Sequence, residues 1–233
     1  MAELRKNRAK HKLEKGETVI AVSCSDTDTI DILGSTGVVD LIWIEMEHGS
    51  VTWSVLSDIS RVCDLWSMTS LVRGNNNDPW LVGRALDRGV QAVVVPHVNN
   101  KTEAERLVIG GKFTPEGMRG MGGSRQGLGV ADYTRKANDE IMLVALIEDV
   151  VGLLLQYGRI CASESCLNGA VSPKNFDMTG SSLSEAGPKE DNMNEQMKEI
   201  VDTINPTNAS LAFQIQVTFT SILENSLLEK RLF

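Results

Sequence analysis

The sequence lacks any apolar run long enough to cross a bilayer, for which a helix needs about 20 consecutive residues. The basic stretch at residues 5–12 leads into no apolar segment, so we expect an exposed amphipathic helix there rather than a signal peptide. Positive charge is also scarce, because 31 acidic against 23 basic residues give a net charge of −8. This balance argues against nucleic acid or an anionic membrane as partner. A cytoplasmic location is expected because the cysteines show no disulfide pattern.

Closely spaced cysteines are absent too. The four cysteines, Cys24, Cys63, Cys161 and Cys166, show no CxxC spacing, so neither a zinc site nor a disulfide framework is indicated. Reduced thiols are expected, and Cys63, which lies in a helical pattern, is assigned to the core. No GxGxxG turn follows the first expected strand, where residues 24–27 read Cys-Ser-Asp-Thr, so dinucleotide binding on a two-layer Rossmann-type sheet is disfavoured.

What the chain does contain is a repeated strand–helix pattern. Its 233 residues, of which 42% are hydrophobic, suffice for one sizeable core. Apolar segments typical of buried strands alternate with segments of helical periodicity, which predicts an α/β fold with a parallel sheet or barrel. The expected strands cover residues 18–24, 39–44, 67–72, 91–96 and 140–147, and the expected helices cover 4–15, 26–33, 53–63, 78–86 and 102–108.

Two stretches depart from that repeat. Residues 113–135 form a long, basic, glycine-rich loop, and a loop of this length inside a compact domain is usually functional or mobile. After residue 151 the periodicity fades, and only about seven strands can be counted where a closed barrel needs eight.

The stretch at residues 39–50, VDLIWIEMEHGS, is the strongest candidate for a functional site. Its apolar part is typical of a strand covered on both faces, and it ends in Glu45, Glu47 and His48. Side chains at the carboxyl ends of strands are where α/β barrels carry out their chemistry. The alternative is a solvated loop that contains a histidine by chance.

Several polar motifs follow one another in a fixed order along the chain. They comprise residues 40–49, 72–73 with 77–79, 86–89 through 95–96, and 115–120 with 137–140 and 147–148. This ordered set resembles the HpcH/HpaI family of metal-dependent pyruvate aldolases. The resemblance extends from about residue 4 to residue 149. It implies a TIM-type (β/α)8 barrel over residues 1–233 as a single domain, with residues 150–233 diverged or incomplete. It also implies cleavage of a 4-hydroxy-2-oxo acid to pyruvate and an aldehyde.

The same resemblance assigns three catalytic residues. Arg73 is implied to hold the pyruvyl carboxylate, for which a planar guanidinium is well shaped. His48 is implied to be the acid/base that handles the substrate hydroxyl proton, since imidazole titrates near neutral pH. Asp87 is implied to pair with His48 and orient it. The plainer alternatives are a surface ion pair for Arg73 and a polar helix end for Asp87.

A divalent cation is implied as cofactor, because cleavage leaves negative charge on an enolate oxygen. Oxygen ligands suit Mg²⁺ or Mn²⁺, with Co²⁺ or Zn²⁺ as further options. Glu148 is implied as one metal ligand, and its alternative is a carboxylate at a helix N-terminus. The second ligand is Asn175 or, two residues on, Asp177, while Ser172 and Pro173 are implied to contact the substrate.

The chain departs from the family at Glu45, where the family usually has Asp, at Leu146, where many members carry Gln, and at Asn175 in place of Asp. Three readings therefore remain: an active aldolase, an oxaloacetate-type decarboxylase that does not need the His48–Asp87 pair, or a non-catalytic relative with a binding or assembly role. The expected partners are a small oxo-acid substrate and further copies of the chain, as hexamers by resemblance.

Overall fold

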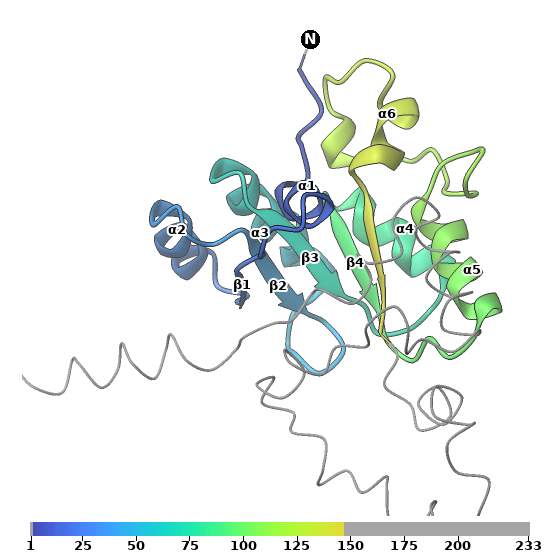
Figure 1. The fold of residues 1–233 in the computed structure, drawn as a ribbon, viewed down its shortest axis with the longest axis horizontal. Coiled ribbons are helices and arrows are strands. Elements are labelled where there is room, and N and C mark those ends of the chain that lie inside the picture. Colours follow the sequence, from blue (N-terminus) through green and yellow to red (C-terminus); the bar gives the residue numbers. More distant parts are fainter. Residues whose placement is uncertain (1, 147–233) are drawn as a thin grey trace, which may run out of the picture.

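The computed structural model describes residues 2–146, which contain one five-stranded sheet. Its strands are β1 (Ala21–Ser23), β2 (Leu41–Glu45), β3 (Thr69–Arg73), β4 (Ala92–Val95) and β5 (Met142–Ala145). All neighbours pair in parallel and in sequence order, β1-β2-β3-β4-β5, so every strand presents its carboxyl end to the same edge. Figure 1 shows the strands running side by side, with α1 beside the edge where they begin.

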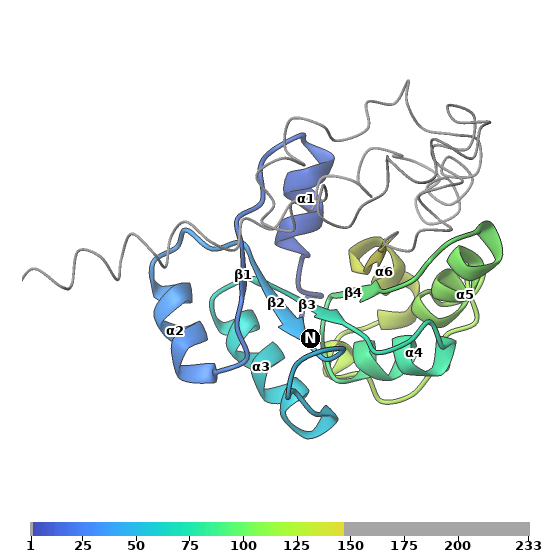
Figure 2. The same cartoon turned by 90° about the horizontal axis from the view of Figure 1, so that it is seen from below.

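Helices alternate with these strands, as the sequence predicts. They are α1 (Arg8–Glu14), α2 (Thr27–Ser35), α3 (Trp53–Leu65), α4 (Pro79–Asp87), α5 (Lys101–Gly111) and α6 (Tyr133–Glu140). Capping explains several starts: Asp26, Asp78 and Asn100 each accept a hydrogen bond from a backbone N–H in the first turn. Figure 2 shows α2, α3, α4 and α5 on one face of the sheet and α1 on the other.

The alternation of side chains along the strands creates two apolar clusters. Ile42, Ile44 and Val72 face the helix layer and belong to the larger cluster, together with Leu56 of α3. The strand residues between them point to the other face of the sheet, here called the inner face, and form a second cluster. Leu41 and Leu71 in this cluster are fully buried. An apolar inner face covered by side chains is what the barrel architecture requires, and it explains why these strands read as continuous apolar runs.

Helix α1 closes the inner cluster at the edge where the strands begin. Its Ala9 and Leu13 pack against the second cluster and are buried. Asn7 caps the helix and bonds to the carbonyls of Gln91 and Glu140, which fixes α1 to the starts of β4 and β5. The predicted amphipathic helix is present, but the prediction that it is exposed is wrong, because its small apolar side fills the inner face of the sheet.

The glycine-rich stretch is more ordered than the sequence suggested. It contains the short 3-10 turn Arg125–Gly127 and the start of α6, a helix that the sequence analysis missed because its only buried residues are Ala137 and Asn138. Arg125 bonds to Asp64 and to the carbonyl of Gly89. A Cβ on Gly89 would lie 2.1 Å from Arg125 Nε, so the absence of a side chain at this position makes room for the guanidinium. Arg125 thus fixes part of this stretch to the helix layer.

No helix within residues 2–146 is both long and apolar enough to span a membrane.

Candidate active site

Two charged side chains end neighbouring strands on the inner face of the sheet. Glu45 is the last residue of β2 and Arg73 the last of β3, and the register places them directly opposite each other. They continue the phase of Leu41 and Leu71, whose side chains belong to the inner cluster. The Arg73 Nε donates to Glu45 Oε2 at 2.7 Å. The predicted site at the carboxyl ends of the strands therefore has a charged pair at its base.

Glu45 also organises the loop that carries His48. Its Oε1 accepts the backbone N–H groups of Glu47 at 2.8 Å and His48 at 3.2 Å, while its Oε2 accepts the Trp43 indole N–H at 3.3 Å. Burial raises the pKa of Glu45, but the hydrogen bonds from His48, Trp43, Arg73 and Glu47 outweigh it and hold the pKa below its ordinary value. Glu45 is therefore an ionised anchor rather than a proton donor near neutral pH.

Glu47 is a second carboxylate that the sequence did not assign. Its Oε2 lies 3.1 Å from Arg73 Nη1 and 3.7 Å from His48 Nε2, and its Oε1 lies 3.5 Å from His97 Nε2. It joins both imidazoles of the site to the guanidinium. The alternate spacing of Glu45 and Glu47 could have indicated that both carboxylates lie on the same side of the chain. Their proximity to His97 could not be predicted, because the position of His97 depends on how the chain turns after β4.

The backbone around His48 is tightly constrained. A Cβ on Gly49 would lie 2.4 Å from the Glu45 carbonyl oxygen, so only glycine lets the loop turn this closely over the end of β2. The Asn75 amide donates to the carbonyl of Met46 at 2.5 Å, which ties this loop to the segment after β3. The His48 side chain itself is 74% exposed and projects into solvent.

Arg73 keeps one free edge. Its Nε donates to Glu45 and its Nη1 forms an ion pair with Glu47, whereas Nη2 has no hydrogen-bond or ion-pair partner among residues 2–146. The guanidinium is 15% exposed and held by two carboxylates, so its position is fixed before any ligand binds. This arrangement is suited to receiving an anionic group at Nη2.

Asp87 lies elsewhere in the chain. It is the last residue of α4, a helix that leads from the end of β3 back to the start of β4, and its Oδ1 accepts from Arg119 Nη2 at 2.8 Å. His48 instead has Glu47 as its carboxylate neighbour. Within one chain the predicted pair of His48 and Asp87 is therefore not formed, because the two residues stand at opposite ends of the sheet.

The predicted metal ligands Glu148, Asn175 and Asp177, and the predicted substrate contacts Ser172 and Pro173, lie outside the described residues. Within residues 2–146 no group of three or more His, Cys, Asp or Glu side chains could hold a metal ion.

The carboxylates nearest the site are already committed. Glu45 and Glu47 both form ion pairs with Arg73. Neither carboxylate can bind a metal ion at this site unless its ion pair with Arg73 breaks. Leu146, where many family members carry Gln, packs against the inner cluster and contributes no polar group.

The sequence matches a known protein family. The sequence model of the HpcH/HpaI aldolase/citrate lyase family matches residues 18–211. The pyruvate aldolase of Rhizobium etli is 34% identical over 153 residues, which cover 63% of this chain and 59% of that protein. The match to this relative thus spans about three-fifths of its length.

Solved structures agree with the barrel prediction. An HpcH/HpaI aldolase from Desulfitobacterium hafniense superposes with a TM-score of 0.57 at 27% identity, covering 64% of this chain and 59% of that one. Macrophomate synthase superposes with a TM-score of 0.60 at 18% identity and covers 99% of this chain and 91% of its own, a likeness of fold alone. The α/β fold of TIM-barrel type is therefore confirmed, and within residues 2–146 it supplies five of its parallel strands.

Proposed function

Because the chain belongs to the HpcH/HpaI aldolase/citrate lyase family, we propose that it is a carbon–carbon lyase that cleaves a 4-hydroxy-2-oxo acid to pyruvate and an aldehyde. The observation that carries this proposal is Arg73, a guanidinium fixed by Glu45 and Glu47 at the carboxyl end of β3 with Nη2 left open. A fixed guanidinium beside an imidazole suits a substrate that has a carboxylate at one end and an ionisable hydroxyl further along.

In this mechanism Arg73 binds the C1 carboxylate of the substrate and sets its orientation. His48 accepts the proton of the C4 hydroxyl, the C3–C4 bond breaks, and its electron pair passes into the C2–C3 bond as an enolate while the aldehyde leaves. Proton return to C3 then gives the methyl group of pyruvate. Glu47, which lies beside the His48 ring, stabilises the imidazolium formed when the proton is taken up.

A divalent cation belongs to the same proposal. Glu148, with Asn175 or Asp177, would hold it through oxygen donors of the kind that Mg²⁺ and Mn²⁺ prefer. When bound, such an ion would offset the negative charge that develops at the C2 oxygen. The residues of the described site play the complementary part, since they fix the carboxylate and move the proton.

Asp87 enters the proposal through a second copy of the chain. Within one chain it faces Arg119 rather than His48, and the family resemblance predicts homo-oligomers with sites near subunit contacts. We therefore assign the His48–Asp87 pair to a contact between two copies. Mixing a His48→Asn chain with an Asp87→Asn chain would then restore part of the activity that each lacks alone, and no recovery would contradict this assignment.

The reaction is tested by measuring pyruvate release from a panel of 4-hydroxy-2-oxo acids, with lactate dehydrogenase and NADH as the coupled readout. We expect release to require added Mg²⁺ or Mn²⁺ and to fall at least about 100-fold in His48→Asn, as is typical for loss of a general acid/base. His11→Asn, on α1 at the other edge of the sheet, is the matched control and should retain activity.

A second substrate separates aldol cleavage from simpler enolate chemistry. Decarboxylation of oxaloacetate also leaves a pyruvate enolate but requires no proton transfer from a hydroxyl. We expect His48→Asn to lose aldol cleavage, whereas Arg73→Lys loses both reactions. If the wild-type chain releases pyruvate from oxaloacetate but from no 4-hydroxy-2-oxo acid, the protein is a decarboxylase and the aldolase proposal is wrong. If it releases pyruvate from neither kind of substrate, the protein is a non-catalytic relative.

A further inference from the structure

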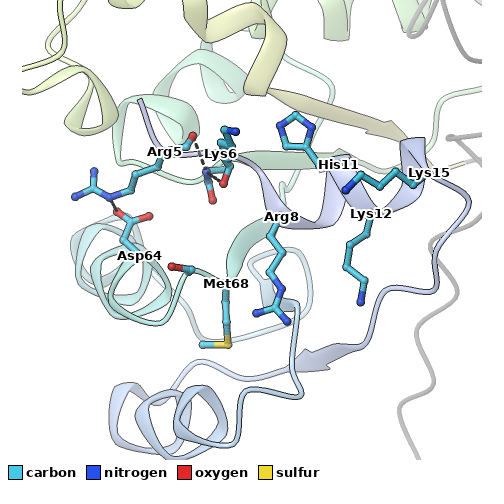
Figure 3. A pocket seen from close by; sticks show the side chains of 10 residues that line it. Arg5, Lys6, Arg8, His11, Lys12, Lys15, Asp64 and Met68 are labelled. Atoms are coloured by element: carbon cyan, nitrogen blue, oxygen red, sulfur yellow. Dashed lines mark hydrogen bonds and ion pairs between the residues drawn. The ribbon is translucent and has the colours of Figure 1, made fainter. Parts of the chain in front are cut away.

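A basic cavity of about 720 Å³ lies at the opposite edge of the sheet from Glu45 and Arg73. It is lined by the N-terminal segment with α1, by the end of α3 and by the residues that precede β3 and β4. Figure 3 shows Arg8 and Lys12 extending from α1 along one side of it, with Arg5 and Asp64 at its other end. Its volume falls within the range of small-molecule sites, about 300–1,000 Å³.

The lining is strongly cationic. Five of its ten residues are lysine or arginine, and Asp64 is the only acidic one. The chain as a whole carries a net charge of −8, so this concentration of cations runs against the overall balance. A concave surface lined by charges of one sign focuses its field on whatever enters it.

Carboxylates near the cavity do not neutralise these cations. Asp40, which is fully buried, faces both Arg8 at 2.8 Å and Lys12 at 2.7 Å, so one negative charge meets two positive ones. Asp64 is likewise shared, by Arg125 at 2.6 Å and Arg5 at 3.5 Å. Each buried acid therefore leaves one positive charge unbalanced.

Two further lysines add to this surplus. Lys6 and Lys15 line the cavity, are exposed, and have no carboxylate partner among residues 2–146. The nearby Glu14 pairs with Lys10 and with His11, which also lines the cavity and pairs with Glu140 as well. Four positive charges thus face the cavity without a matching acid in the described part of the chain.

From this geometry we propose that the cavity is a binding site for a small polyanion that carries at least two phosphate groups. A phosphate monoester carries about 1.5 to 2 negative charges near neutral pH, so one group would leave about half of the surplus unbalanced. The cations surround one cavity rather than forming an extended stripe, and the acidic remainder of the chain would repel a long nucleic acid. The site is separate from the proposed active site, and its occupancy does not depend on aldolase activity.

The test is isothermal titration of the full chain with sodium tripolyphosphate at low ionic strength. The pocket variant is Lys6→Glu/Lys15→Glu, and the matched control is Lys101→Glu/Lys136→Glu, which reverses two exposed lysines on α5 and α6. We expect one molecule to bind per chain, with a Kd raised about tenfold or more in the pocket variant and unchanged in the control. Raising salt to about 0.15 M should weaken binding, since the Debye length is then about 8 Å.

Three outcomes would overturn the proposal. The first is no binding by the wild-type chain at low salt, and the second is an equal loss of affinity in both double variants, which would show general charge attraction. The third is binding to phosphatidylserine vesicles without binding to tripolyphosphate, which would indicate a membrane surface instead. If circular dichroism shows that the pocket variant is unfolded, Lys6→Gln/Lys15→Gln takes its place, with a smaller rise in Kd expected.

Discussion

Removing the Arg73 guanidinium should destabilise the chain in a way that depends on pH. Arg73 faces Glu45 at 2.7 Å and Glu47 at 3.1 Å, and the three side chains are 15%, 22% and 11% exposed. Arg73→Ala leaves two mostly buried carboxylates without a cation. Breaking a fully buried ion pair costs about 3–5 kcal/mol and an exposed one about 0–1 kcal/mol, so we expect a loss of about 2–3 kcal/mol at pH 7.

The sign of the pH dependence follows from Glu45. Despite burial, hydrogen bonds hold its pKa in the folded wild-type chain below the ordinary glutamate value of about 4.3. The contribution of ionised Glu45 to the unfolding free energy is therefore complete above the ordinary glutamate pKa and is lost as the pH falls through the pKa of Glu45 in the folded chain. Arg73→Ala removes one of the hydrogen bonds that lower the pKa of Glu45, so the pKa of Glu45 is higher in the variant than in the wild type. The stability difference between wild type and variant should consequently shrink between pH 7 and pH 4.

The assay is urea unfolding followed by circular dichroism at pH 7 and at pH 4. Arg61→Ala is the matched control, because Arg61 pairs with Asp58 on the exposed side of α3 and should contribute little at either pH. The account would be refuted if Arg73→Ala cost no more than Arg61→Ala, or if its cost were the same at both pH values.

Three further predictions concern other parts of the fold. Burial lowers the pKa of Lys112 to about 8, so between about pH 8 and 10.4 the unfolded chain binds a proton that the folded chain does not. The unfolding free energy should therefore rise across this range by on the order of 3 kcal/mol. Urea titrations should show this rise in the wild type and not in Lys112→Met. Burial raises the pKa of Cys63 to about 12, so iodoacetamide at pH 8 should modify Cys24 before Cys63, and peptide mapping that finds the two labelled equally fast would contradict this. Gly49→Ala should lower the unfolding free energy by about 1–3 kcal/mol through its clash with the end of β2, whereas Gly120→Ala, with open space at the Cβ position, should change it little in the same urea titration.

Much of the fold could be predicted because local patterns and packing agree. The apolar runs of β2 and β4 predict buried strands, and the helices expected at residues 26–33 and 78–86 are present, with Asp26 and Asp78 as their N-caps. The helix α1 was predicted, but its burial was not, for a physical reason: Ala9 and Leu13 give a weak apolar stripe, and only the shape of the inner face shows that such small side chains fit there. The missed α6 likewise buries too little apolar surface to produce a clear period.

The candidate site was predicted in part. Residue order placed Glu45 and Arg73 at the ends of neighbouring strands, and parallel pairing then brought them to 2.7 Å. The role of Glu47 as the link to His48 and His97 depends on how two loops turn, which single-sequence patterns do not encode. The separation of Asp87 from His48 follows from the direction of α4, since a helix that returns to the start of the next strand ends far from the site.

The most direct test of the central claim is deuterium exchange at the methyl group of pyruvate, followed by NMR with and without Mg²⁺ or Mn²⁺. Exchange requires only that the site form the pyruvate enolate and needs no knowledge of the aldehyde. The account predicts metal-dependent exchange by the wild-type chain, its loss in Glu148→Ala, and a strong reduction in Arg73→Lys. A folded, metal-saturated chain that exchanges no methyl protons would contradict the proposed aldolase function.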